Sequence, residues 1–122
     1  MRYKNKNLIS ALRSSINGLK ILASEKAAIR EIYLLLFSIF FIYIIKPNII
    51  YILWLIILPC LILSIEALNT AIEYTCDKIT IKKSDKIKKA KDLGSASIFI
   101  SLLVYAIVII FCIYEKVRVN LI

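Results

Sequence analysis

Two long uncharged apolar runs constrain the fold of this chain more than any other feature of its sequence. Pro47 to Ile65 covers 19 residues and Leu93 to Tyr114 covers 22, and neither run contains a charged residue. A helix of about 20 apolar residues crosses the ~30 Å hydrocarbon core of a bilayer. In addition, 61% of the 122 residues are hydrophobic, which is more than so small a water-soluble domain can bury. The sequence therefore predicts an all-α membrane protein.

A third apolar run, Ile32 to Ile45, becomes long enough to span the membrane if its helix extends toward Glu25 and Arg30 snorkels to the interface. We expect transmembrane helices over about 28–46, 49–75 and 93–115, within one domain that covers residues 1–122. The helix of the second span is expected to continue through Glu66 and Glu73.

The segment before the first span is amphipathic. At 100° per residue its apolar side chains share one face, and serines, Asn17 and basic residues share the other; the apolar set is Leu8, Leu12, Ile16, Leu19 and Leu22. This pattern is typical of a helix that lies in the headgroup plane, and we expect such a surface helix over about 7–24. The alternative is a helix that simply packs on the transmembrane bundle.

The net charge of +9 is concentrated beside the apolar runs. Residues 1–30 contain seven basic residues and one acid, and residues 78–91 contain seven basic residues. Such flanking charge indicates membrane topology and anionic headgroups, so we expect no nucleic-acid partner. The positive-inside rule predicts a multi-pass protein with its N-terminus and a 77–92 loop in the cytoplasm and its C-terminus outside.

Several classes of active site are excluded by residues that the chain lacks. It has no histidine, so a Ser-His triad and every His-containing metal site are excluded. Its two glycines, Gly18 and Gly94, are too far apart for a glycine-rich phosphate loop. The three cysteines have no metal-binding spacing and are interpreted as small membrane residues.

One polar stripe follows the second apolar run. Glu66, Asn69, Glu73 and Asp77 stand at i, i+3, i+7 and i+11, so they fall within about 80° of one another on a helix. Carboxylates near hydrocarbon are costly unless they are paired or reach water. Clustered carboxylates without His or Cys favour Mg²⁺, so the stripe indicates a hard-cation site. The alternative is that these side chains only join helices by hydrogen bonds.

Further charged residues stand where the other spans begin. Lys91 and Asp92 precede the third run, and Glu25 and Glu31 precede the first. A lysine at this place can hold phosphate oxygens as a point charge, and Glu25 can supply a carboxylate opposite Glu73. Solvated charges at helix ends are the alternative interpretation.

These residues resemble a known family. Glu66-Ala-Leu-Asn69-Thr-Ala-Ile-Glu73, followed by Asp77, resembles the E-x-L-N-[ST]-A-I-E-x-x-x-D signature of the small prokaryotic diacylglycerol kinases. Lys91-Asp92-Leu93-Gly94-Ser95-Ala96 resembles the lysine–aspartate element of the same family. The length, the three spans and the amphipathic first helix agree as well, so the resemblance covers nearly the whole chain.

The resemblance implies a lipid kinase of the cell (inner) membrane that acts as a homotrimer and transfers phosphate from Mg-ATP to diacylglycerol, giving phosphatidate. By this resemblance Glu66 is the catalytic base for the lipid hydroxyl, and Asn69 is a catalytic residue beside it. Glu25 and Glu73 are implied to bind Mg²⁺ and, with it, ATP.

The remaining implied roles concern the binding of the two substrates, ATP and the lipid. Lys91 and Asp92 are implied to contact ATP, and Glu31, Glu66 and Ser95 are implied to line the lipid side. An alternative substrate is undecaprenol, although Gly94-Ser95-Ala96 resembles the diacylglycerol branch more. From another class, a small transporter or channel subunit, or a purely structural membrane protein, remains an alternative.

The chain departs from the family pattern in three places. The Ile-Arg pair after Glu25 is displaced by one residue, and a second register would put Lys26 where the acid belongs; Glu25 is preferred because a lysine cannot bind Mg²⁺. The ATP-side arginine has no clear counterpart, with Lys6 or Arg13 as substitutes. The segment 81–84 lacks an aromatic residue to stack on adenine.

Overall fold

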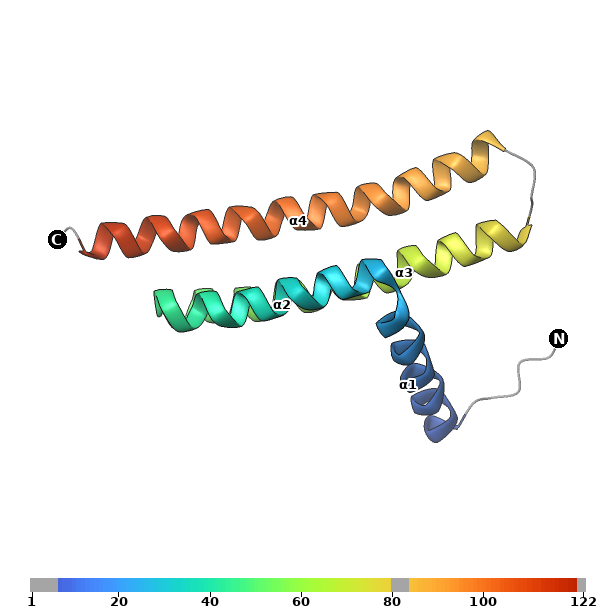
Figure 1. Cartoon of the computed structure of the whole chain (residues 1–122), viewed down its shortest axis with the longest axis horizontal. Helices are drawn as coiled ribbons and strands as arrows, with labels where there is room; N and C mark the ends of the chain where they lie inside the picture. The colour runs from blue at the N-terminus through green and yellow to red at the C-terminus, as the bar shows by residue number, and fades with distance from the viewer. Residues whose placement is uncertain (1–6, 80–83, 121–122) are drawn as a thin grey trace.

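The computed structural model describes residues 7–79 and 84–120, and within them the chain forms helices joined by short turns (Figure 1). Figure 1 shows three of the helices running side by side and the first one leaving them at a steep angle. The central helix, α3, packs against both α2 and α4. In chain order the helices are α1 (Leu8–Ser24), α2 (Lys26–Ile45), α3 (Ile49–Ile79) and α4 (Asp85–Asn120).

The turn between α2 and α3 is set by local backbone chemistry. Lys46 adopts the left-handed conformation, with φ 49°, and its N–H bonds the carbonyl of Ile42, so it ends α2. The Asn48 side chain then accepts hydrogen bonds from the N–H groups of Ile50 and Tyr51 and so caps α3. Its amide nitrogen donates to both carboxylate oxygens of Glu115 on α4, at 3.0 Å each. The turn is thereby tied to the third span.

The apolar core lies where α3 and α4 meet, with partly buried side chains of α2 packed against it. It contains the buried side chains Leu55, Leu58, Ile62, Tyr105 and Cys112. Tyr105 also forms a buried hydrogen bond of 2.6 Å with Ser38 of α2. Pro59 lies inside α3 without ending it, as neighbouring helices allow in membrane spans.

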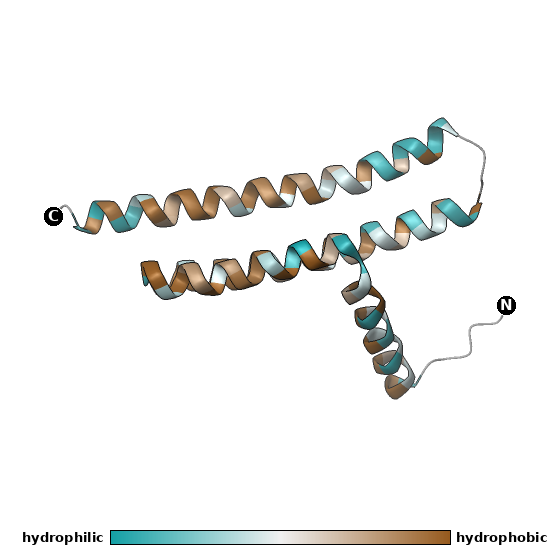
Figure 2. Ribbon diagram, viewed as in Figure 1, coloured by the Kyte–Doolittle hydropathy of each residue, from teal (hydrophilic) through white to brown (hydrophobic). Residues whose placement is uncertain are grey.

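The outward faces of α2, α3 and α4 are apolar. Each of these helices is long and apolar enough to cross a bilayer, and no more than 28% of the most apolar window of any of them is buried inside the chain. Figure 2 shows the hydrophobic colour continuing around the middle of α4, with hydrophilic residues toward its ends. This distribution confirms the predicted membrane fold, because lipid can cover faces that water cannot.

Helix α1 has the predicted amphipathic character. Figure 2 shows brown and teal alternating along it. Of its residues only Leu22 is buried, whereas Leu8, Leu12, Ile16 and Leu19 are exposed. Within one chain the apolar face therefore does not pack on the bundle, which favours the surface-helix prediction over the alternative.

The prediction of a 77–92 loop is wrong for most of that segment. Helix α3 runs to Ile79, four residues beyond the expected span, and α4 begins at Asp85 rather than near residue 93. At its other end α4 continues to Asn120. The cause is that a helix need not end where the hydrocarbon ends: Lys and Ala are good helix formers, and Asp85 in the first turn complements the helix dipole.

Candidate active site

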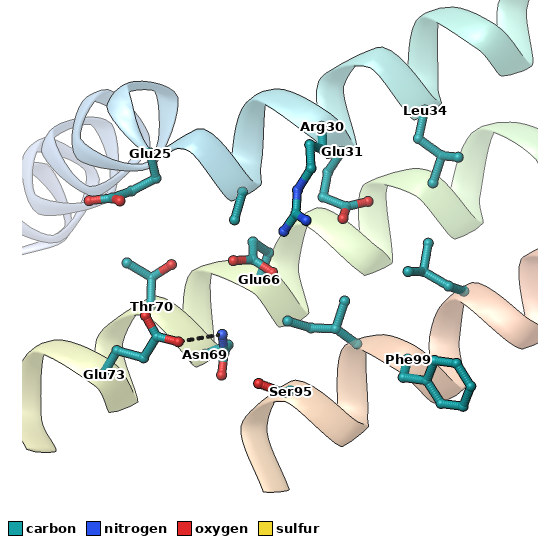
Figure 3. Close-up of a pocket in the computed structure, with 13 residues that line it drawn as sticks. Glu25, Arg30, Glu31, Leu34, Glu66, Asn69, Thr70, Glu73, Ser95 and Phe99 are labelled. Carbon is teal, nitrogen blue, oxygen red and sulfur yellow. Dashed lines mark hydrogen bonds between the residues drawn. The ribbon is translucent and has the colours of Figure 1, made fainter. Parts of the chain in front are cut away.

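A cavity of about 520 Å³ opens between α2, α3 and α4 near the N-terminal end of α2, where α1 departs (Figure 3). It combines acidic and amide groups of α3 with polar and apolar groups of the two flanking helices. Its lining residues are Glu25, Ala27, Arg30, Glu31, Leu34, Glu66, Asn69, Thr70, Glu73, Ser95, Ile98, Phe99 and Leu102. Three members of the predicted polar stripe are thus gathered in one cavity, while Asp77 does not line it.

Glu66 lies on the α3 wall of the cavity and is only 2% exposed. Within the described part of the chain, its Oε2 atom has no hydrogen-bond partner. A buried carboxylate oxygen without a donor is costly, because desolvation is not compensated. The arrangement therefore leaves a strong acceptor available to a hydrogen-bond donor that enters the cavity.

Asn69 stands next to Glu66 along the cavity and is also buried. Its Nδ2 donates to Glu73 Oε1 at 3.3 Å, and no described residue donates to its Oδ1. The backbone of Gly94 lies directly against this amide, and a Cβ at that position would overlap Oδ1. Gly94 is thus required for α4 to approach α3 closely at this level.

The α2 side contributes a pair of opposite charges. Glu31 is 5% exposed, whereas Arg30 is exposed and lines the cavity. Figure 3 shows Arg30 reaching from α2 toward Glu66, with Glu31 beside it. From the sequence alone, Arg30 is interpreted only as a snorkelling residue. Its position directly before Glu31 is the sequence signal that could have placed it at the site.

Glu25 occupies the corner between α1 and α2. Its backbone is extended, with φ −81° and ψ 133°, and its side chain lines the cavity from this corner. The Tyr74 hydroxyl of α3 donates a hydrogen bond to Glu25 Oε1. Lys26, the residue of the alternative register, does not line the cavity.

The donor set fits a divalent ion only if another ligand helps to hold it. Glu25 and Glu73 both line the cavity, but in residues 7–79 and 84–120 no group of three acidic or thiol side chains is arranged to hold a metal ion. Mg²⁺ usually binds one or two carboxylates together with substrate phosphates and water. The two glutamates therefore fit an ion that arrives with a phosphate ligand.

The two predicted ATP contacts on α4 lie outside the cavity. Lys91 Nζ forms a salt bridge of 2.5 Å with Asp77 Oδ1, which connects the cytoplasm-facing ends predicted for α3 and α4. Asp92 is exposed, and neither residue lines the cavity. Ser95, one turn further along α4, does line it. Asp77, the fourth member of the stripe, is thus paired with Lys91 and does not line the cavity.

Three other sequence predictions concern nucleotide contacts. Lys6 and residues 81–83 lie outside the described residues. Arg13 is exposed on α1 and does not line the cavity.

Comparison with known proteins identifies similar sequences. The sequence model of the family described as prokaryotic diacylglycerol kinase matches residues 13–113. A diacylglycerol kinase of Haemophilus influenzae is 33% identical over 103 residues, which cover 84% of this chain and 87% of that protein. A diacylglycerol kinase of Pseudomonas aeruginosa is 43% identical over 54 residues, covering 43% of this chain and 44% of that protein.

Proposed function

We propose a specific reaction for this chain, which belongs to the prokaryotic diacylglycerol kinase family and is therefore a multi-pass membrane enzyme with ATP as co-substrate. It phosphorylates diacylglycerol to phosphatidate in the cavity of Figure 3, with Glu66 as general base. The observation that carries this proposal is the buried Glu66 carboxylate with an unpartnered oxygen in that cavity. A lipid hydroxyl is a donor of the right kind for this oxygen.

The alternative in which the polar stripe only joins helices is less well supported. Such a role requires each buried polar atom to find a donor or acceptor on another helix. Glu66 Oε2 and Asn69 Oδ1 find none among the described residues. Two orphaned acceptors in a cavity are instead typical of a site that is completed by its substrate.

The proposed reaction begins at the lipid hydroxyl. The lipid hydroxyl donates its hydrogen bond to Glu66, and the proton passes to this carboxylate as the alcohol oxygen forms a bond to the γ-phosphorus. The bond from that phosphorus to the bridging oxygen breaks on the opposite side, and ADP leaves with the electron pair. Asn69, fixed between Glu73 and Gly94, orients the groups near the reacting oxygen.

Positive charge for the phosphates comes from three sources. Mg²⁺, held by Glu25 and Glu73 together with ATP, would neutralise phosphate charge when bound. Arg30 adds a guanidinium from α2 on the side of the cavity that holds Glu66. We assign the outer phosphates to Lys91, with Asp92 beside it, because this lysine stands one turn from Ser95 and carries a mobile point charge.

The lipid side is assigned to the deeper part of the cavity. Glu31 and Ser95 offer polar groups near Glu66, and apolar side chains continue the lining toward the membrane; they are Leu34, Ile98, Phe99 and Leu102. An acyl chain can therefore stay in an apolar environment while its hydroxyl reaches the base. This arrangement supports a substrate that never leaves the bilayer.

The assembly and topology complete the proposal. The protein is a homotrimer in the cell inner membrane, with the N-terminus and the 77–92 segment in the cytoplasm and the C-terminus outside. The apolar faces left open on each span support further packing between copies, and the basic residues at the cavity end support its cytoplasmic orientation.

The experiment is a phosphate-transfer assay in mixed micelles with radiolabelled ATP and Mg²⁺. Separate arms contain diacylglycerol, undecaprenol or no lipid, and the products are separated by thin-layer chromatography. We expect labelled phosphatidate from diacylglycerol. Transfer to undecaprenol but not to diacylglycerol would reject the proposed substrate, and absence of transfer to either lipid would reject the proposed activity.

A further inference from the structure

Glu25 is the one proposed metal ligand that no helix holds in place. Helix α1 ends at Ser24 and α2 begins at Lys26, so Glu25 lies between them with extended backbone. The direction of a side chain within a helix is set by the regular backbone. A side chain in the turn between two helices needs another contact to fix its direction. Glu73 differs, because it lies within α3 and accepts a hydrogen bond from Asn69.

Tyr74 supplies a constraint from the neighbouring helix. It follows Glu73 on α3, and its hydroxyl donates to Oε1 of Glu25. Among the hydrogen bonds of the described residues, this one involves Oε1 and none involves Oε2. One oxygen is therefore anchored to α3, while the other has no hydrogen-bond partner among the described residues.

Tyr74 lines a second, apolar groove. This groove, of about 380 Å³, lies between α1 and α3 and adjoins the cavity, because Thr70 lines both. Its lining from α1 includes Gly18, Leu19 and Leu22, and Tyr74 lines it from α3. The Tyr74 side chain stands at the edge of this groove and is 55% exposed, and its hydroxyl reaches Glu25 at the corner where α1 ends.

We propose that Tyr74 is a positioning residue, which holds the Glu25 carboxylate at the rim of the cavity so that it can bind a divalent cation together with Glu73. This inference rests on the proposed function, in which these two glutamates bind the ion. Tyr74 itself contacts neither substrate. Its effect is to reduce the freedom that Glu25 loses when it binds a metal, which is the general benefit of preorganisation.

The experiment measures Mn²⁺ binding without turnover. Mn²⁺ serves as the probe, its free fraction is followed by electron paramagnetic resonance, and a non-hydrolysable ATP analogue is present at saturation. Tyr74→Phe keeps the ring and removes only the hydroxyl. We expect the Mn²⁺ dissociation constant to rise about three- to tenfold, the net effect of losing one ordinary hydrogen bond. Tyr114→Phe, exposed on α4 far from the cavity, is the matched control and leaves the constant unchanged.

A double variant shows whether Tyr74 acts through Glu25. In a Glu25→Gln background, Tyr74→Phe should produce little further change, because the group that it positions is already altered. An equal rise in both backgrounds, or a Mn²⁺ constant in Tyr74→Phe equal to that of the native protein, would overturn the inference. The thermal midpoint in detergent shows that Tyr74→Phe is folded.

Kinetics separate this inference from the proposed function. At saturating Mg²⁺ the kcat of Tyr74→Phe should stay within about twofold of native, while the Mg²⁺ concentration for half-maximal rate rises. If native protein transfers no phosphate to diacylglycerol, the proposed function fails while the Mn²⁺ result still stands. If native protein is active and Tyr74→Phe has the native Mg²⁺ requirement, only this inference fails.

Discussion

The backbone of Gly94 lies directly against the side-chain amide of Asn69, so α3 and α4 meet at the wall of the cavity with no side chain between them. This contact fixes the distance between the helix that carries Glu66 and the helix that carries Ser95. It also holds Asn69 in the orientation in which Nδ2 donates to Glu73. The position of a small residue on one helix therefore determines the geometry of the acidic wall on another.

The first prediction concerns this contact. In Gly94→Ala the new Cβ would overlap the Asn69 amide, so Asn69 or α4 must move. We expect kcat to fall about 10- to 100-fold, the usual cost of displacing a group near the reacting atoms. Gly18→Ala is the matched control, because no atom lies within 4 Å of a Cβ at Gly18. Full activity in Gly94→Ala would show that the close approach has no role in the site.

The second prediction concerns Ser38 and Tyr105, which join α2 to α4 by a buried hydrogen bond. Tyr105→Phe leaves Ser38 bonded to the carbonyl of Leu34, whereas Ser38→Ala strands the tyrosine hydroxyl. We expect Ser38→Ala to lower the free energy of unfolding by about 1–2 kcal/mol and Tyr105→Phe by less.

Unfolding by sodium dodecyl sulfate in mixed micelles measures this difference. Ser64→Ala is the control, because the Ser64 hydroxyl is exposed and bonds only its own helix. The opposite order of the two losses would contradict the account.

The third prediction separates Glu25 from Lys26. Glu25→Gln and Glu73→Gln should each raise the Mg²⁺ concentration for half-maximal rate by about tenfold or more, because a carboxamide is a much weaker ligand for this hard ion. Lys26→Gln should leave the requirement near native, since Lys26 does not line the cavity. A titration of the rate against Mg²⁺ measures this, and a strong effect of Lys26→Gln alone would favour the other register.

The fourth prediction concerns Lys91. Lys91→Met should raise the KM for ATP about tenfold, as expected for the loss of a charged contact to phosphate, with a smaller change in kcat. Stability should change little, because the Lys91–Asp77 pair is 37% and 67% exposed and such pairs contribute little. Lys88→Met, on the same exposed segment, is the control. A KM unchanged by Lys91→Met would remove this lysine from the nucleotide site.

Local sequence patterns predict a large part of this structure. Hydrophobic run length specifies the spans, and the i, i+3, i+7 spacing places Glu66, Asn69 and Glu73 on one face, because both patterns depend only on the geometry of a single helix. The same reasoning identified α1, whose apolar face stays exposed apart from Leu22.

The features that could not be predicted depend on the packing of one helix on another. The contact of Gly94 with Asn69, the direction of Arg30 and the pairing of Lys91 with Asp77 all require the register between helices, which spacing within one helix does not specify. The helical extension from Asp85 was missed for a different reason: hydropathy marks where the hydrocarbon ends, whereas helix ends are set by backbone propensity and capping.

The most direct test of the central claim is the kcat of Glu66→Gln for diacylglycerol phosphorylation. This substitution keeps the size of the side chain and removes its ability to take a proton. We predict that the variant assembles as native protein does and that its kcat falls by about 10²-fold or more, whereas Glu115→Gln, on α4 at the far end of the bundle from the cavity, keeps native activity. A Glu66→Gln enzyme with normal kcat would contradict the account.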